Sequence, residues 1–135
     1  MPREQERERR SAFFASQPKA QPVFEAAVRT IRRKFPSVGL RVESNQIAFD
    51  DPHAFAYAWL PPGLVNGRPE ECVVLSFVLP RAVEHARISN ITFVRADRYT
   101  HHVPLHVGRT VDQQVLDWLS EAHDLMRSTY RRGRR

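Results

Sequence analysis

The segment Cys72-Val-Val-Leu-Ser-Phe-Val-Leu79 is the most apolar run in the chain, and it decides the fold class. A run of about four to eight apolar residues that is closed by a proline, here Pro80, is typical of a buried strand. It is far shorter than the roughly 20 residues that cross a bilayer. The segment therefore predicts the central strand of a sheet.

Shorter strand patterns lie on both sides of this segment, and turn signals separate them. The patterns cover residues 40–43, 46–49, 55–60, 88–94 and 101–107. Ser44-Asn45 suits a tight turn or a bulge, and Asp50-Asp51-Pro52 reads as a turn. The proline- and glycine-rich segment 61–69 reads as a loop. We expect a sheet of about five strands, the first ones being short.

Helical patterns precede the strands. Ser11–Ala15 fits one helical turn with Ser11 as its cap and Phe13 and Phe14 directed to the core. A second helix begins near Pro22 and ends before Pro36. Its apolar residues recur with helical spacing, and they are Val23, Phe24, Ala27, Val28 and Ile31.

A third helical pattern closes the chain. Thr110 and Gln113 match a capping box, in which the first residue caps the helix and the second bonds back to it. The buried stripe that follows is Val111, Val115, Leu119, Ala122 and Met126. Helices at both ends with strands between them predict an α+β fold. We expect a mostly antiparallel sheet with its helices packed on one face.

The ends of the chain carry most of its net charge of +6. Residues 131–135 contribute +4 and residues 1–10 contribute +1, which leaves +1 for the stretch between them. We therefore expect a single domain over residues 11–130, between a charged N-terminus and a basic C-terminal tail. Residues 1–10 read either as disordered or as a frayed helical extension. A near-neutral folded part is not a shaped nucleic-acid surface, although the tail can hold phosphate loosely.

Composition also limits the cellular compartment that we expect for the protein. The single cysteine, Cys72, cannot form an internal disulfide, and the first ten residues lack the apolar stretch of a secretory signal. No apolar run is long enough to span a membrane. By elimination, we expect a cytoplasmic protein.

The histidines of Arg98-Tyr-Thr-His-His-Val-Pro-Leu-His106 invite a metal-site interpretation, but their spacing argues against it. His101 and His102 point to opposite faces of a strand. His102 and His106 share a face but lie roughly 13 Å apart, too far for one ion. Pro104 excludes a helix that would bring them together. We therefore expect no metal ligands here and no cofactor.

Nucleophile patterns are also weak. Ser76 lacks the glycines of a nucleophile elbow, and Cys72 follows two acidic residues that would raise its pKa if they were close. Phe55, Tyr57 and Trp59 share one face of a strand, with alanines on the other. Core packing under a helix explains these rings more readily than base stacking does.

Four segments resemble, in order, a family known as domain of unknown function 5655. They are Ser44-Asn-Gln-Ile-Ala-Phe49, Phe55-Ala-Tyr-Ala-Trp-Leu-Pro61, Val73-Val-Leu-Ser-Phe-Val-Leu-Pro-Arg81 and Tyr99-Thr-His-His-Val103. The resemblance runs from about Phe13 to Met126, and Tyr99 replaces a tryptophan that family members often carry. It implies a small α+β domain and no established activity. If the family's polar positions form a site, they correspond to Ser44, Gln46, Arg81, Thr100, His101 and His102, none with a catalytic role.

These observations favour a non-catalytic module that binds a small anionic ligand or an acidic protein segment. Arg81, Thr100 and His101 or His102 would form its pocket, since histidine, arginine and hydroxyl groups suit phosphate or carboxylate. The first alternative is an enzyme that uses His101 or His102 as general acid or base. The second is a weak nucleic-acid accessory that grips phosphate through Arg131–Arg135. We expect no membrane partner.

Overall fold

The structure, a computed structural model, describes residues 3–61 and 72–133. Its helical elements are α1 (Arg3–Phe13), the short 3-10 helix η1 (Pro18–Ala20), α2 (Gln21–Lys34) and α3 (Gln113–Gly133). Its strands are β1 (Gly39–Val42), β2 (Ile47–Asp50), β3 (Ala54–Trp59), β4 (Val73–Leu79), β5 (Asn90–Arg95) and β6 (Arg98–Leu105). The segment 61–69, which the sequence predicts to be a loop, lies almost entirely outside the described residues.

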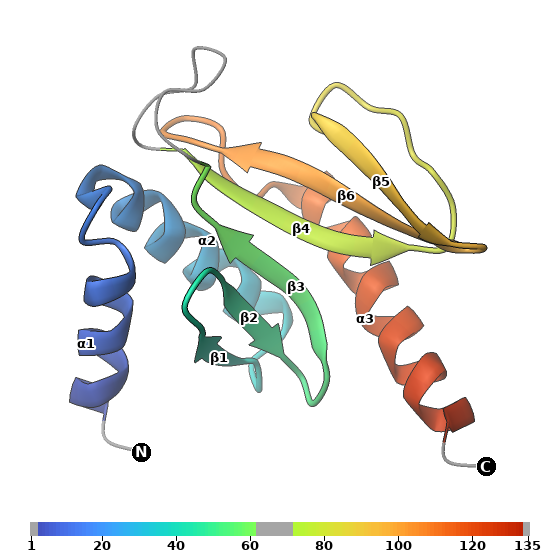
Figure 1. The fold of residues 1–135 in the computed structure, drawn as a ribbon, viewed down its shortest axis with the longest axis horizontal. Helices are drawn as coiled ribbons and strands as arrows, with labels where there is room; N and C mark the ends of the chain where they lie inside the picture. Colours follow the sequence, from blue (N-terminus) through green and yellow to red (C-terminus); the bar gives the residue numbers. More distant parts are fainter. Residues whose placement is uncertain (1–2, 62–71, 134–135) are drawn as a thin grey trace.

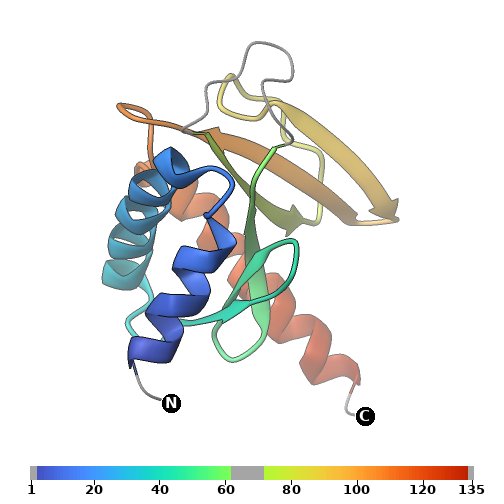
Figure 2. The same ribbon diagram turned by 60° about the vertical axis from the view of Figure 1, so that its left-hand side comes forward.

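The strands form one antiparallel sheet in the order β1-β2-β3-β4-β6-β5. Helices α2 and α3 pack on one face of it, and α1 lies beside α2 and β1 (Figures 1 and 2). The predicted α+β fold and the central position of residues 73–79 are confirmed. The sheet has six strands rather than about five, because β1 and β2 both pair as separate strands.

Alternation along β4 divides the sheet into two faces. Leu75 and Phe77 point to the helices, and Phe77 stacks on Trp118 of α3 with ring centroids 6.1 Å apart. On the neighbouring strand, Val103 pairs with Leu75 and shares this face. Helix α2 contributes Phe24, whose ring lies 6.1 Å from that of Phe49. The core is therefore a layer between the sheet and these two helices.

Strand β3 corrects one expectation about the aromatic residues. Phe55 lies at a register irregularity between β2 and β3 and packs in the core, with its ring 4.9 Å from Phe35. Tyr57 pairs with Ser76, and Trp59 pairs with Val74, on the face away from α2 and α3. We call the face that carries Tyr57, Trp59, Ser76, Thr92 and His102 the outer face. The three rings thus do not share a face, and only Phe55 packs under a helix.

The N-terminal segment forms a longer helix than one turn. Ser11 lies within α1 rather than at its cap, which corrects the expected start of this helix. Arg10 ties α1 to α2 through Glu25, with 3.0 Å between Nε and Oε2. Phe14 is 1% exposed and contacts Phe24, as expected for a residue directed to the core.

Helix α3 begins later than the sequence predicts. The backbone N–H of Val115 donates to Asp112 Oδ1 over 3.0 Å, so Asp112 is the cap. The hydroxyl of Thr110 is buried and has no hydrogen-bond partner among residues 3–61 and 72–133, so the expected capping box with Gln113 is wrong. The helix continues through Gly133 and thus includes part of the expected tail. None of the helices in the described ranges has the length and apolarity that a bilayer crossing requires.

Candidate functional site: an arginine groove between α1 and β1

Three adjoining cavities follow α1 along the first edge of the sheet. Their volumes are about 530, 430 and 330 Å³. The first two share Glu6, Arg32 and Val38, and the last two share Arg9 and Val42, so they form one continuous groove. Five arginines line it, and we call it the arginine groove. They are Arg7, Arg9, Arg10, Arg32 and Arg41.

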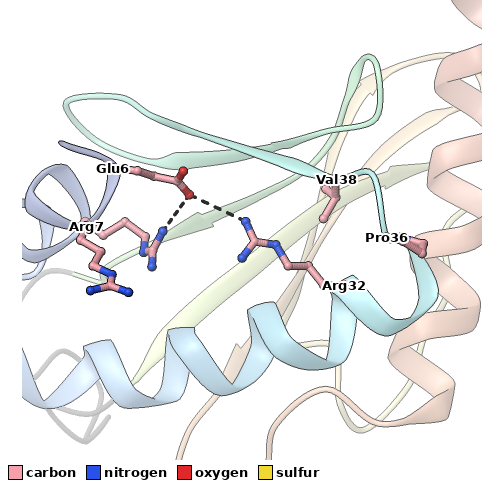
Figure 3. A pocket seen from close by; sticks show the side chains of 6 residues that line it. Glu6, Arg7, Arg32, Pro36 and Val38 are labelled. Atoms are coloured by element: carbon pink, nitrogen blue, oxygen red, sulfur yellow. Dashed lines mark hydrogen bonds and ion pairs between the residues drawn. The ribbon is translucent and has the colours of Figure 1, made fainter. Parts of the chain in front are cut away.

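Glu6 lies at the centre of this groove between two cations. Its Oε1 is 2.8 Å from Nη1 of Arg10 and 3.7 Å from Nη2 of Arg32. Figure 3 shows Glu6 of α1 and Arg32 of α2 directed toward one another, with Val38 forming part of the wall. Arg10 also bonds to Glu25, and its side chain is only 14% exposed. Arg10 is therefore satisfied, whereas within the described part of the chain Arg32 makes only its long contact to Glu6.

A second, closed ion-pair cluster lies on β1. Arg41 Nε is 3.0 Å from Asp50 Oδ2, and Arg41 also pairs with Glu43. The hydrogen bond to Asp50, followed by the charge of Asp50, raises the pKa of Arg41. Asp50 and Glu43 both pair with Arg41. These ion pairs hold its guanidinium group against the sheet, so it is not available to a ligand.

Arg7 and Arg9 differ from these paired arginines. Both are exposed, and neither has an ion-pair or hydrogen-bond partner among residues 3–61 and 72–133. Together with Arg32 they provide three guanidinium groups that can donate hydrogen bonds to a ligand's carboxylate or phosphate. No site is predicted here from the sequence, because the sign alternation of residues 1–10 reads as disorder or a frayed helix.

Ser44 and Gln46 lie at the far end of this groove. Ser44 lines the third cavity, beside the turn that joins β1 to β2. The side-chain amide of Gln46 donates to Glu43 Oε1 over 2.8 Å. Of the six residues predicted for a site, only these two belong to the same region as the groove.

The other four predicted residues are divided between the faces of the sheet. His101 pairs with Phe77 on the helix side, while Thr100 pairs with Val78 and His102 with Ser76 on the outer face. Arg81 forms an ion pair with Glu121 of α3, and this hydrogen bond raises the pKa of Arg81. Thr100 and His101 therefore do not line a common pocket.

His101 is completely buried, and its ring is saturated with backbone hydrogen bonds. Its Nε2 accepts from the N–H of Val83 over 2.9 Å, and its Nδ1 lies 2.9 Å from the carbonyl oxygen of Tyr99. Since a carbonyl only accepts, the hydrogen of the neutral ring is on Nδ1. Burial lowers the pKa of His101, with a smaller contribution from the charge of Arg81. No ring nitrogen is left for a substrate.

His102 belongs to a hydrogen-bonded row on the outer face. Trp59 Nε1 donates to Ser76 Oγ over 2.8 Å, Ser76 Oγ is 2.7 Å from His102 Nδ1, and His102 Nε2 is 3.2 Å from Thr92 Oγ1. An indole N–H can only donate, so Ser76 Oγ accepts from Trp59 and still has its own hydrogen and a second lone pair for the contact to His102 Nδ1. Next to this row, burial raises the pKa of Tyr57.

This row contains a serine and a histidine, but the burial and existing hydrogen bond of the serine do not suit nucleophilic catalysis. Ser76 is 5% exposed, and its oxygen already accepts the Trp59 N–H. A nucleophilic serine needs a free path to the reacting carbon and a donor set for the developing oxyanion. Among the described residues, no three histidine, cysteine, aspartate or glutamate side chains are grouped as metal ligands, and Cys72 is buried.

The comparisons with known proteins give one result. No curated protein and no solved structure matches the chain significantly. The family described as Domain of unknown function (DUF5655) matches residues 10–126, which span the whole sheet, α2 and most of α3. This confirms the resemblance seen in the sequence: the chain belongs to the DUF5655 family.

Proposed function

We propose that this protein is a non-catalytic binding module whose arginine groove holds an acidic segment of a partner protein. The observation that carries the proposal is the continuity of the groove, from Pro36 at one end to Ser44 at the other. A compact anion would occupy only one of the three adjoining cavities. An extended chain with several carboxylates would occupy all of them.

The pairing of the arginines supports this choice. Arg7 and Arg9 have no acidic partner in the described part of the chain, and Arg32 holds Glu6 only over 3.7 Å. An exposed ion pair contributes about 0.2–1 kcal/mol, so a single carboxylate would bind too weakly to matter. Several acidic side chains that bind together give useful affinity, and that affinity falls with added salt.

The lining of the groove favours binding over catalysis. The described side chains that line it include no histidine or cysteine, and its acids already hold arginines. Groups that titrate near neutral pH, which general acid–base catalysis uses, are therefore missing from its described lining. Acid–base chemistry by His102 is the second hypothesis, and the observation that favours it is the partly exposed ring bonded to Ser76.

Fluorescence polarisation with a labelled oligoglutamate peptide tests the proposal. We expect binding that weakens between about 50 and 200 mM salt, and no binding of an oligoglutamine peptide. Arg32→Gln should weaken binding about fivefold, equivalent to one lost ion pair. The double variant Arg7→Gln/Arg9→Gln should weaken it further.

Arg33→Gln provides the matched control. Arg33 is the next residue of α2, is exposed, and does not line the groove. Equal affinities of the Arg32→Gln and Arg33→Gln variants, with no further loss on replacing Arg7 and Arg9, would show that the groove is not the binding site. Circular dichroism of each variant checks that the fold is retained.

A further inference from the structure

A separate pocket lies where the β2–β3 turn meets the last turns of α3. It has a volume of about 250 Å³ and is lined by Pro52, His53, Arg127, Tyr130 and Arg131. None of these residues belongs to the arginine groove. The pocket combines two features that its surroundings do not explain: a pair of stacked rings and two unpaired cations.

The rings come from different elements. His53 of the turn and Tyr130 of α3 stack with centroids 3.8 Å apart and an interplanar angle of 11°. The turn is fixed against α3 by Asp51, whose Oδ2 is 3.1 Å from Nε2 of His123. Tyr130 is nevertheless 49% exposed. The stack therefore holds the tyrosine ring in place while half of its surface faces solvent.

The cations flank this ring. Arg127 and Arg131 are four residues apart, so they lie on the same side of α3 as neighbours. Both are exposed, and neither has an acidic partner in the part of the chain that the structure describes. The nearest acid before them on the helix, Asp124, lies 3.9 Å from His123 Nδ1. No acid among residues 3–61 and 72–133 lines the pocket.

The helix itself does not account for an anion here. The C-terminal end of a helix carries partial negative charge, which repels anions. Phosphate can bind only if the guanidinium groups overcome this repulsion, and two of them within one turn provide the charge and the bonding geometry. A planar group can also stack on an immobilised aromatic ring, as bases do in single-strand binders.

We propose that this pocket binds one nucleotide unit, with the base stacked on Tyr130 and the phosphate held between Arg127 and Arg131. The shared chemistry is a planar ring joined to a phosphate, and the source is either a free nucleotide or a single strand. This proposal does not depend on the function of the arginine groove.

The test is a fluorescence-anisotropy titration with a labelled oligothymidylate, followed by competition with thymidine monophosphate. Tyr130→Leu should weaken strand binding about tenfold. Arg127→Gln and Arg131→Gln should each reduce the slope of log affinity against log salt by about 0.7. Competition by thymidine monophosphate at equal nucleotide concentration identifies a free nucleotide as the occupant, and its absence identifies a strand.

Two controls separate the pocket from loose electrostatic binding. Phe93→Leu removes another exposed ring, 64% exposed on β5, and Arg95→Gln removes another exposed arginine of that strand. Neither should change binding. The loss caused by Tyr130→Leu should persist in a chain that ends at Gly133. Equal binding by the Tyr130→Leu and Phe93→Leu variants, or no binding of either probe to the unmodified protein, would overturn the proposal.

Discussion

Acidification should destabilise this protein through His101. This residue is fully buried, and each of its ring nitrogens already bonds to a backbone group. A second proton would have to go on Nε2, which faces the N–H of Val83, so the ring would lose an acceptor and bury a charge. Burial lowers its pKa below the ordinary value of 6.5, so the native ring stays neutral where the unfolded ring becomes charged.

The sign and size of the effect follow from this difference. Above the unfolded pKa of about 6.5, neither state binds the extra proton and His101 adds no pH dependence. Below it, the unfolded chain binds a proton that the native protein does not, so the free energy of unfolding falls. The slope is at most about 1.4 kcal/mol per pH unit until the native pKa is reached. At about pH 5 the loss is thus up to about 2 kcal/mol.

Urea unfolding of the unmodified protein and of His101→Gln, each at about pH 7.5 and pH 5, measures this loss. Glutamine keeps one donor and one acceptor but cannot become charged. Other groups that act on His101, namely Arg81, His102 and Glu121, are present in both proteins and largely cancel. The variant should lose less stability on acidification. An equal loss in both proteins would refute the assignment of this pH dependence to His101.

Two further predictions concern the connection between the last strand and α3. Asp112→Ala should lower the free energy of unfolding by about 1–2 kcal/mol, because Asp112 caps α3. Thr110→Val should leave the free energy of unfolding unchanged, because the Thr110 hydroxyl has no partner among the described residues. If urea unfolding shows the opposite order, the expected capping box is correct after all. Arg87 is 8% exposed and donates to the carbonyl of Thr110 over 2.8 Å and to Asp112 over 2.7 Å. Arg87→Gln should therefore lower the free energy of unfolding by about 2 kcal/mol. Arg109→Gln, at an exposed position, should change it by no more than about 0.5 kcal/mol. Equal losses in the two variants would contradict a structural role for Arg87.

The elements that the sequence predicts well are those with a local cause. The apolar run of β4 ends at Pro80, and the helical stripe of α2 ends before Pro36. In both elements the apolar pattern and the following proline therefore predict the same end. Helix α1 has almost no apolar stripe of its own, and it is held by contacts across the chain such as Arg10 to Glu25. A pattern within ten residues cannot reveal such a contact.

The candidate sites show the same limit. Strand alternation alone separates His101 from His102, and the structure places them on opposite faces, as that rule predicts. The arginine groove depends on α1, α2 and β1 meeting. The pocket at Tyr130 depends on His53 of a turn meeting α3, 77 positions later along the chain. Charge and aromatic residues were visible in the sequence, but their proximity was not.

His101 and His102 lie in different hydrogen-bonded surroundings and give the protein two built-in spectroscopic reporters. The ring of His101 carries its hydrogen on Nδ1, and nitrogen-15 NMR distinguishes this form from one that carries it on Nε2. The signal of His101 would respond to loosening of the helix-packed core, because Tyr99 and Val83 hold its ring. The signal of His102 would respond to anything that contacts the outer face. One labelled sample would therefore follow both sides of the sheet at once.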